Sequence, residues 1–101
     1  MNITLKTPKE IRQEIAARAK RLRLDLNISQ MDLAARTGIS LSSIKRFESQ
    51  GLISLSALLH IALVLGRLED FETLFVTSAR LSLFLPTPKK RLRAGTKNVK
   101  S

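Results

Sequence analysis

The stretch that decides the fold is QMDLAARTGISLSSIKRFE, residues 30–48. It contains two segments of helical periodicity, separated by only three residues, Gly38-Ile39-Ser40. A break this short forces the two helices to cross steeply, at about 90–120°. Gly38 suits the left-handed backbone conformation that ends a helix, and the small side chain of Ala34 allows close approach. The outer face of the second helix is then free to enter a DNA major groove, which is about 12 Å wide.

The sequence on either side continues the helical pattern and carries its own start and stop signals. The predicted helices cover about residues 8–24, 30–37, 41–49, 54–66 and 68–75. Side chains that favour helix starts precede or open four of them: Thr7, Ser29, Ser40 and Ser54. Residues 80–85, RLSLFL, alternate as a strand does but equally fit one helical turn, so both readings stay open. We predict an all-α fold, a compact bundle of about five helices.

The apolar positions of these segments form the predicted core. In the first helix they are Ile11, Ile15, Ala19, Leu22 and Leu26. In the predicted helix at residues 30–37 we expect Met31, Leu33 and Ala34 to pack inward. Ile39, Ile44 and Phe47 are expected to close the core beneath the short turn. Glycines at positions 51 and 66 end the third and fourth helices.

The length and charge of the chain indicate one small basic domain. Its 101 residues include 18 Lys or Arg and 8 Asp or Glu, a net charge of +10 that favours a polyanionic partner. Residues 86–101 contain no acid but six bases: Lys89, Lys90, Arg91, Arg93, Lys97 and Lys100. We therefore predict a domain at residues 1–85 and a basic flexible tail at 86–101. The tail is either a solvated segment or an arm that binds phosphates or the minor groove.

The residue types leave few parts for an enzyme. There is no Cys and a single His, and no Gly-rich phosphate loop or His-containing metal cluster is evident, so we expect no catalysis, metal or cofactor. His60 lies in an apolar segment and is expected to be packed or interfacial. The longest apolar stretch, residues 53–65, is too short to span a membrane, and we expect a cytoplasmic protein. Trp and Tyr are absent, so stacking platforms for RNA are missing.

The spacing of Gln30, Ala34, Gly38, Ile44 and Phe47 resembles the helix-turn-helix of Cro/repressor-type regulators. The resemblance covers about residues 8–75 and implies a five-helix, DNA-binding repressor domain.

A wider pattern adds a second resemblance. It includes Ser29-Gln30, a Glu-x-x-Gly ending at Glu48 and Gly51, the segment LEDFETLF at 68–75 and the basic cluster at 89–93. This pattern is similar to HipB-like regulators, the DNA-binding antitoxins paired with HipA-type kinase toxins.

Residue roles follow from the resemblance and from position on the second helix of the motif. Gln30 is expected at a phosphate, where side-chain and backbone amides can meet it. The resemblance implies that base edges are read by Leu41, Ser42, Lys45 and Arg46, with Ser40 and Ser43 at phosphates. Arg46 can pair bidentately with guanine, whereas Lys45 favours a phosphate or mixed role. Leu41 either touches a thymine methyl or forms a partly buried staple.

Further basic residues are candidates for phosphate contacts. They are Arg18, Arg21 and Arg23 near the end of the first helix, and Lys89, Lys90, Arg91 and Arg93 in the tail. For the three arginines of the first helix, a solvated face with favourable charge near a helix C-terminus is an equal alternative. Glu48 is expected to be a structural acid that pairs locally.

These expectations combine into a sequence-specific repressor that binds double-stranded operator DNA. One recognition helix reads few base pairs, so a homodimer on a pseudo-palindromic operator is expected. The resemblance to HipB implies an antitoxin that autoregulates its operon and has a HipA-like kinase toxin, or an associated toxin–antitoxin subunit, as partner. The alternative is a stand-alone or phage-type repressor without a toxin partner.

Overall fold

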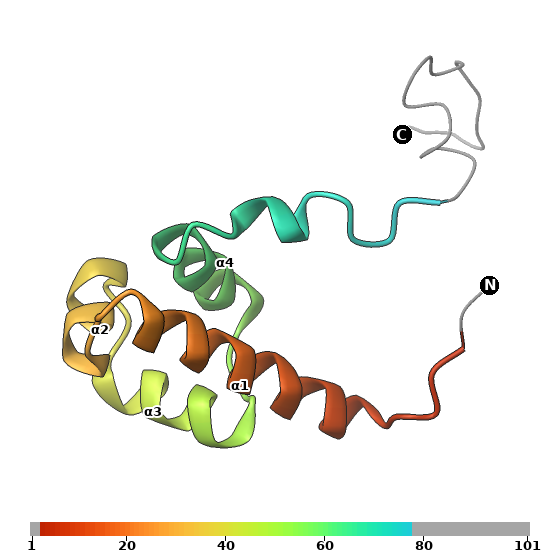
Figure 1. The fold of residues 1–101 in the computed structure, drawn as a ribbon, viewed down its shortest axis with the longest axis horizontal. Helices are drawn as coiled ribbons and strands as arrows, with labels where there is room; N and C mark the ends of the chain where they lie inside the picture. Colours follow the sequence, from red (N-terminus) through yellow and green to blue (C-terminus); the bar gives the residue numbers. More distant parts are fainter. Residues whose placement is uncertain (1–2, 78–101) are drawn as a thin grey trace, which may run out of the picture.

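A computed structural model describes residues 3–77 of the chain. Its elements are α1 (Pro8–Asp25), α2 (Gln30–Thr37), α3 (Leu41–Gln50), α4 (Leu55–Val64) and the 3-10 helix η1 (Leu68–Phe71) (Figure 1). The described part contains no strand, so the prediction of an all-α fold is confirmed there. Residues 80–85 and the tail at 86–101, on which we made predictions, lie outside the described residues.

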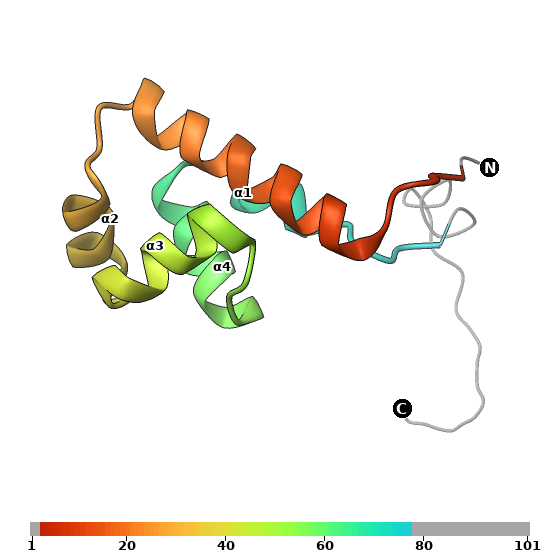
Figure 2. The ribbon, with the colours of Figure 1, turned by 90° about the horizontal axis from the view of Figure 1, so that it is seen from below.

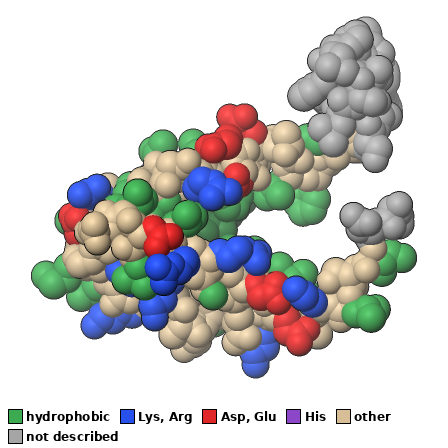
Figure 3. Space-filling model, viewed as in Figure 1, with side chains coloured by type: hydrophobic (Ala, Val, Ile, Leu, Met, Phe, Trp, Pro, Cys, Tyr) green, Lys and Arg blue, Asp and Glu red, His purple; other side chains and the backbone are tan. Residues whose placement is uncertain are grey.

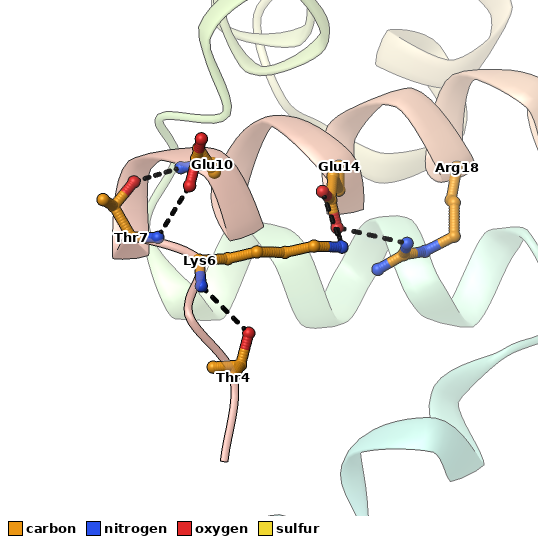
Figure 4. Close-up of polar contacts among 6 residues, drawn as sticks. All are labelled: Thr4, Lys6, Thr7, Glu10, Glu14 and Arg18. Atoms are coloured by element: carbon orange, nitrogen blue, oxygen red, sulfur yellow. Dashed lines mark hydrogen bonds and ion pairs between the residues drawn. The ribbon is translucent and has the colours of Figure 1, made fainter. Parts of the chain in front are cut away.

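The four α-helices begin at the side chains that the sequence indicated. Thr7 and Glu10 form a reciprocal capping box, in which the Thr7 hydroxyl accepts from the Glu10 N–H at 3.1 Å and Glu10 accepts from the Thr7 N–H at 2.8 Å (Figure 4). The hydroxyls of three serines accept a backbone N–H three residues ahead, at 3.0–3.1 Å: Ser29, Ser40 and Ser54. Each cap satisfies an N–H that the first helical turn leaves without a partner.

Two glycines in the left-handed conformation end α2 and α3. Gly38 has a φ of +76° and donates its N–H to the Ala34 carbonyl at 2.9 Å, which closes α2 and opens the short turn. Gly51 has a φ of +72° and also lies against α1, because a Cβ at this position would come within 2.7 Å of the Arg12 carbonyl carbon and oxygen. The end of α3 therefore packs directly on the backbone of α1.

The core lies where all four helices meet. Leu33, Ile44 and Ile61 are the largest fully buried side chains, and Phe47 and Ala16 are also buried. Ile15, Ala19, Leu22, Ala34 and Ile39 pack around this cluster, in agreement with the sequence.

Two residues expected in the core are instead exposed. Met31 is 70% exposed, because it lies two positions, about 200°, around α2 from Leu33 and therefore faces away from the core. Leu26 is 49% exposed, in the turn that follows α1.

The prediction of a fifth α-helix at residues 68–75 is wrong. Only η1 forms there, and the chain continues as turns that end in Phe75 at a φ of +66°. The apolar side chains of this segment find little to pack on within the described residues, since Leu74 is 55% exposed and Phe75 is fully exposed. A short helix depends on such packing, so periodicity alone does not sustain it.

The arrangement of the helices separates two faces of the molecule. α3 packs on α1 and α2, α4 packs on α2, and η1 contacts α4. Figure 1 shows α3 and η1 on opposite sides of α1, and Figure 2, from a second direction, shows α3 running obliquely toward the middle of α1. α3 and α4 meet at 94°. Among the described helices no single one has the length and apolar composition to cross a membrane. The bent pair α3–α4 has them only when the two helices are taken together.

Candidate nucleic-acid interface

A buried polar network fixes α3 against the end of α1. The Arg23 guanidinium donates two hydrogen bonds to the Glu48 carboxylate, from Nε to Oε2 at 2.7 Å and from Nη2 to Oε1 at 3.0 Å. Its Nη1 donates to the Ile28 carbonyl at 2.8 Å, and Gln30 Nε2 donates to Glu48 Oε1 at 2.9 Å. The Arg23 and Glu48 side chains are only 6% and 5% exposed. The charge pair is therefore both internal and bidentate, the strong form of this interaction.

This network decides the roles of two predicted residues. Glu48 is a structural acid, as the sequence indicated, but its partner Arg23 is 25 positions away on α1 and not local in the sequence. Arg23 was a candidate phosphate contact, but its guanidinium is directed inward and occupied by Glu48 and Ile28. In the structure Arg23 follows the buried Ala16 by seven residues, and positions spaced by seven share one face of a helix, so Arg23 lies on the inward face of α1.

The outward face of α3 carries the side chains expected to meet bases. Ser42, Lys45 and Arg46 are exposed, on the side away from the buried Ile44 and Phe47. Within residues 3–77 neither Lys45 nor Arg46 has a hydrogen bond or ion pair from its side chain, so both cations are free to meet an external partner. Figure 3 shows basic side chains gathered at the lower left of the molecule, over the end formed by α2 and α3.

The N-terminal end of α3 is a cluster of hydroxyls. Ser40 Oγ caps the helix, donates to Ser43 Oγ at 2.8 Å and lies 3.3 Å from Ser42 Oγ. Leu41 is half-buried, a position compatible with both roles considered for it. Hydroxyls and free N–H groups at a helix N-terminus are suitable donors for a phosphate.

Gln30 occupies the first position of α2, directly after the cap at Ser29. One N–H of its side-chain amide is used by Glu48, and a primary amide has a second N–H to donate. The side chain is therefore oriented by the buried network while retaining a donor for a phosphate.

The two other arginines of α1 are on the surface. Arg18 is 69% exposed and lies 3.9 Å from Glu14, which also binds Lys6 at 2.9 Å (Figure 4). Arg21 is 73% exposed and pairs with Asp25 at 2.8 Å, one turn ahead. Exposed pairs of this kind contribute little to stability, so either arginine can exchange its partner for a phosphate. The tail candidates Lys89, Lys90, Arg91 and Arg93 lie outside the described residues.

The remaining chemistry of the described part is sparse. Residues 3–77 contain no group of three or more His, Cys, Asp or Glu that could hold a metal ion. His60, which we expected to be packed or interfacial, is exposed on α4, and its Nδ1 lies 2.9 Å from the Ser56 carbonyl oxygen. What the geometry offers is an exposed helix with free cations, held in place by the short turn at Gly38 and by the buried pair of Arg23 and Glu48.

Comparison with known proteins agrees with this geometry. A family model described as helix-turn-helix matches residues 20–71, just over half of the chain, from the end of α1 to the end of η1. No curated protein matches the chain. The family is a DNA-binding and not an enzymatic one, and its members regulate transcription. The chain therefore belongs to the helix-turn-helix family of the Cro/repressor type and is a DNA-binding transcriptional regulator.

Proposed function

We propose that the protein is a sequence-specific transcriptional repressor whose α3 reads the major groove of operator DNA. The observation that carries this proposal is the pair of exposed, unpartnered cations Lys45 and Arg46 on a helix whose opposite face is buried. Because α3 is held by the Arg23–Glu48 pair, these cations are presented at a fixed angle. A cation that is held in a fixed orientation can select one base edge, instead of being attracted only to the phosphate backbone of the DNA.

The proposed contacts divide into two kinds. Base edges are read by Leu41, Ser42, Lys45 and Arg46, with Lys45 sharing a phosphate role. Phosphates are bound by Gln30, Ser40 and Ser43, with Arg18 and Arg21 at the flanks. Arg23 is not among these contacts, because its guanidinium is engaged inside the domain.

The operator is proposed to be pseudo-palindromic and bound by a homodimer. One recognition helix reads only a few base pairs, so two copies about 34 Å apart give useful affinity and selectivity. The direct test is an electrophoretic mobility shift with the DNA that flanks the protein's own coding region. We expect a sequence-selective, salt-sensitive shift at submicromolar protein. Equal affinity for a shuffled DNA of the same composition would reject sequence-specific repression.

A second candidate function is that of a HipB-like antitoxin. It is favoured by the sequence pattern from Ser29 to Gly51 and by the basic cluster at residues 89–93. In this function the protein represses its own operon in the cytoplasm and binds a HipA-like kinase toxin or an associated subunit. Co-purification with the product of the adjacent reading frame tests it. If that frame encodes no kinase-like or toxin-like protein, stand-alone or phage-type repression remains.

A further inference from the structure

An apolar groove runs between α1, α4 and η1. α1 contributes Ile15, Ala19 and Leu22, and α4 contributes Leu58, Ile61 and Leu65. Arg67, Asp70 and Phe71 lie at the η1 side, where Arg67 pairs with Asp70 at 2.9 Å. The groove has a volume of about 240 Å³. A cavity of about 150 Å³ holds a benzene-sized group, so this groove has room for one or two large aliphatic side chains.

The groove lies away from the proposed reading helix α3, although Arg18, a proposed flanking phosphate contact, is among its lining residues. None of its lining residues comes from α2 or α3. Figure 1 places η1 and α3 on opposite sides of α1, and Figure 3 shows hydrophobic side chains along the opening between α1 and the segment that begins with η1. An occupant of the groove and a DNA duplex on α3 can therefore be bound at the same time.

The chain itself carries a segment of matching chemistry just beyond the described residues. Residues 80–85, RLSLFL, place Leu81, Leu83 and Leu85 on one side when the backbone is extended, because side chains alternate with a period of two. Its only charge is that of Arg80. The acids nearest in sequence to the groove lie in and directly after η1: Glu69, Asp70 and Glu72.

Chain length allows the segment to reach the groove within one molecule. Phe71 lines the groove, and Thr77 is six residues further along the chain. A chain spans at most about 3.3–3.6 Å per residue. The six residues from Phe71 to Thr77 and the six from Thr77 to Leu83 therefore have the same maximum length. Leu83 can thus come back to the groove however far residues 71–77 carry the chain away from it.

We propose that residues 80–85 bind in this groove of their own chain, with Leu83 inserted against Ala19, Leu58 and Phe71 and with Leu81 and Leu85 at its margins. The segment then completes the apolar surface that α1 and α4 leave open. It also fixes the point at which the basic residues 86–101 leave the domain, on the side of α1 opposite α3. The occupant is thus the chain itself, and a second copy in the groove is the competing outcome.

Disulfide trapping tests the proposal directly, because the full chain contains no Cys. In the variant Ala19→Cys/Leu83→Cys, we expect mild oxidation of dilute protein to give an intrachain disulfide, since bonding requires Cα atoms about 4.4–6.8 Å apart. The matched control is Ala17→Cys/Leu83→Cys, whose helix position is exposed and about 200° away around α1. Peptide mass mapping and non-reducing electrophoresis separate intrachain from interchain products.

We expect at least a tenfold faster intrachain reaction for the 19/83 pair than for the 17/83 pair. Equal rates for the two pairs would overturn the proposal, and predominant interchain bonding through position 19 would assign the groove to a second copy. As an independent measure, Leu83→Asp should lower Tm by about 4 °C or more. Ser82→Asp, on the opposite side of the extended segment, should change Tm by less than about 2 °C. An unchanged Tm in Leu83→Asp would also contradict the proposal.

Discussion

The guanidinium of Arg23 and the carboxylate of Glu48 form a two-point ion pair that joins the last turns of α1 and α3. The two residues are 25 positions apart in the sequence, and both side chains lie in the interior. Because Gln30 also donates to Glu48, the pair couples the start of α2 to the same point. The crossing angle of the helix-turn-helix is therefore held by a polar contact in addition to apolar packing.

Removing the carboxylate of Glu48 should destabilise the fold strongly. In Glu48→Ala the buried charge of Arg23 loses its partner, and breaking such a pair costs about 3–5 kcal/mol. Thermal and urea unfolding of the full chain measure this loss. The control is Arg36→Ala, which removes an exposed pair to Asp32 and should cost less than about 0.5 kcal/mol. Similar losses in the two variants would show that the buried pair does not hold the fold.

The two left-handed glycines should differ in their tolerance of a side chain. Gly38→Ala introduces a Cβ that meets nothing within 4 Å, so only the backbone conformation is penalised, by about 1–2 kcal/mol. In Gly51→Ala the same penalty is joined by contact with the Arg12 backbone at 2.7 Å, and α3 must move away from α1. We expect the larger loss of unfolding free energy at position 51. A greater loss at position 38 would contradict the close approach of α3 to α1.

Substitution of Arg46 should change which DNA sequences are preferred. If Arg46 pairs bidentately with guanine, Arg46→Ala removes about 1–3 kcal/mol of discrimination between matched and mismatched sites. Its exposed side chain has no bond within the described domain, so Tm should stay constant. Competition binding against a panel of single-base operator variants measures the effect. Arg67→Ala, on the η1 side, is the control and should leave the preferences unchanged.

Substitution of Lys45 should act mainly on affinity. A lysine that binds a phosphate contributes equally to the affinity for every DNA sequence, so Lys45→Ala should weaken binding to all DNA sites by a similar factor. The slope of log K against log salt should fall by about 0.9 for one lost phosphate contact. Titrations at several salt concentrations test this. A selective loss at one base pair, with the slope preserved, would instead assign Lys45 to base reading.

Deletion of residues 87–101 should weaken DNA binding broadly while preserving site preference. The proposed phosphate contacts in this segment are Lys89, Lys90, Arg91 and Arg93. Losing four such contacts would reduce the salt slope by about 3 to 4 units. Sedimentation of the deleted chain provides the necessary check. If dimerisation is lost while the salt slope is kept, the tail serves assembly and not DNA contact.

The local features of the fold were predictable because they depend on neighbouring residues. Ser40 is followed three residues later by the N–H that it caps, and Gly38 must accept a positive φ to end α2. The alternation of apolar and polar residues in α3 likewise placed Ile44 and Phe47 inside. Each of these signals is contained in fewer than ten residues of sequence.

The features that the sequence did not show depend on distant partners. Arg23 resembled the other arginines of its helix until its position against Glu48 was known. The predicted helix at 68–75 failed for the same kind of reason: its periodicity was correct, but Phe75 has no surface to pack on among the described residues. Periodicity reports which side of a helix is apolar, and only the tertiary structure reports whether anything covers it.

The separation between the two faces of α3 has a consequence for how such a regulator can diversify. Ile44, Phe47 and Glu48 fix the helix to the domain, whereas the side chains of Lys45 and Arg46 make no hydrogen bond or ion pair with the rest of the described chain. Replacing an exposed side chain of this kind usually changes stability by less than about 0.5 kcal/mol. New operator preferences can therefore arise by single substitutions at the outward positions, with every intermediate still folded. Retargeting the protein to another DNA sequence is then a matter of exchanging a few surface side chains on an unchanged frame.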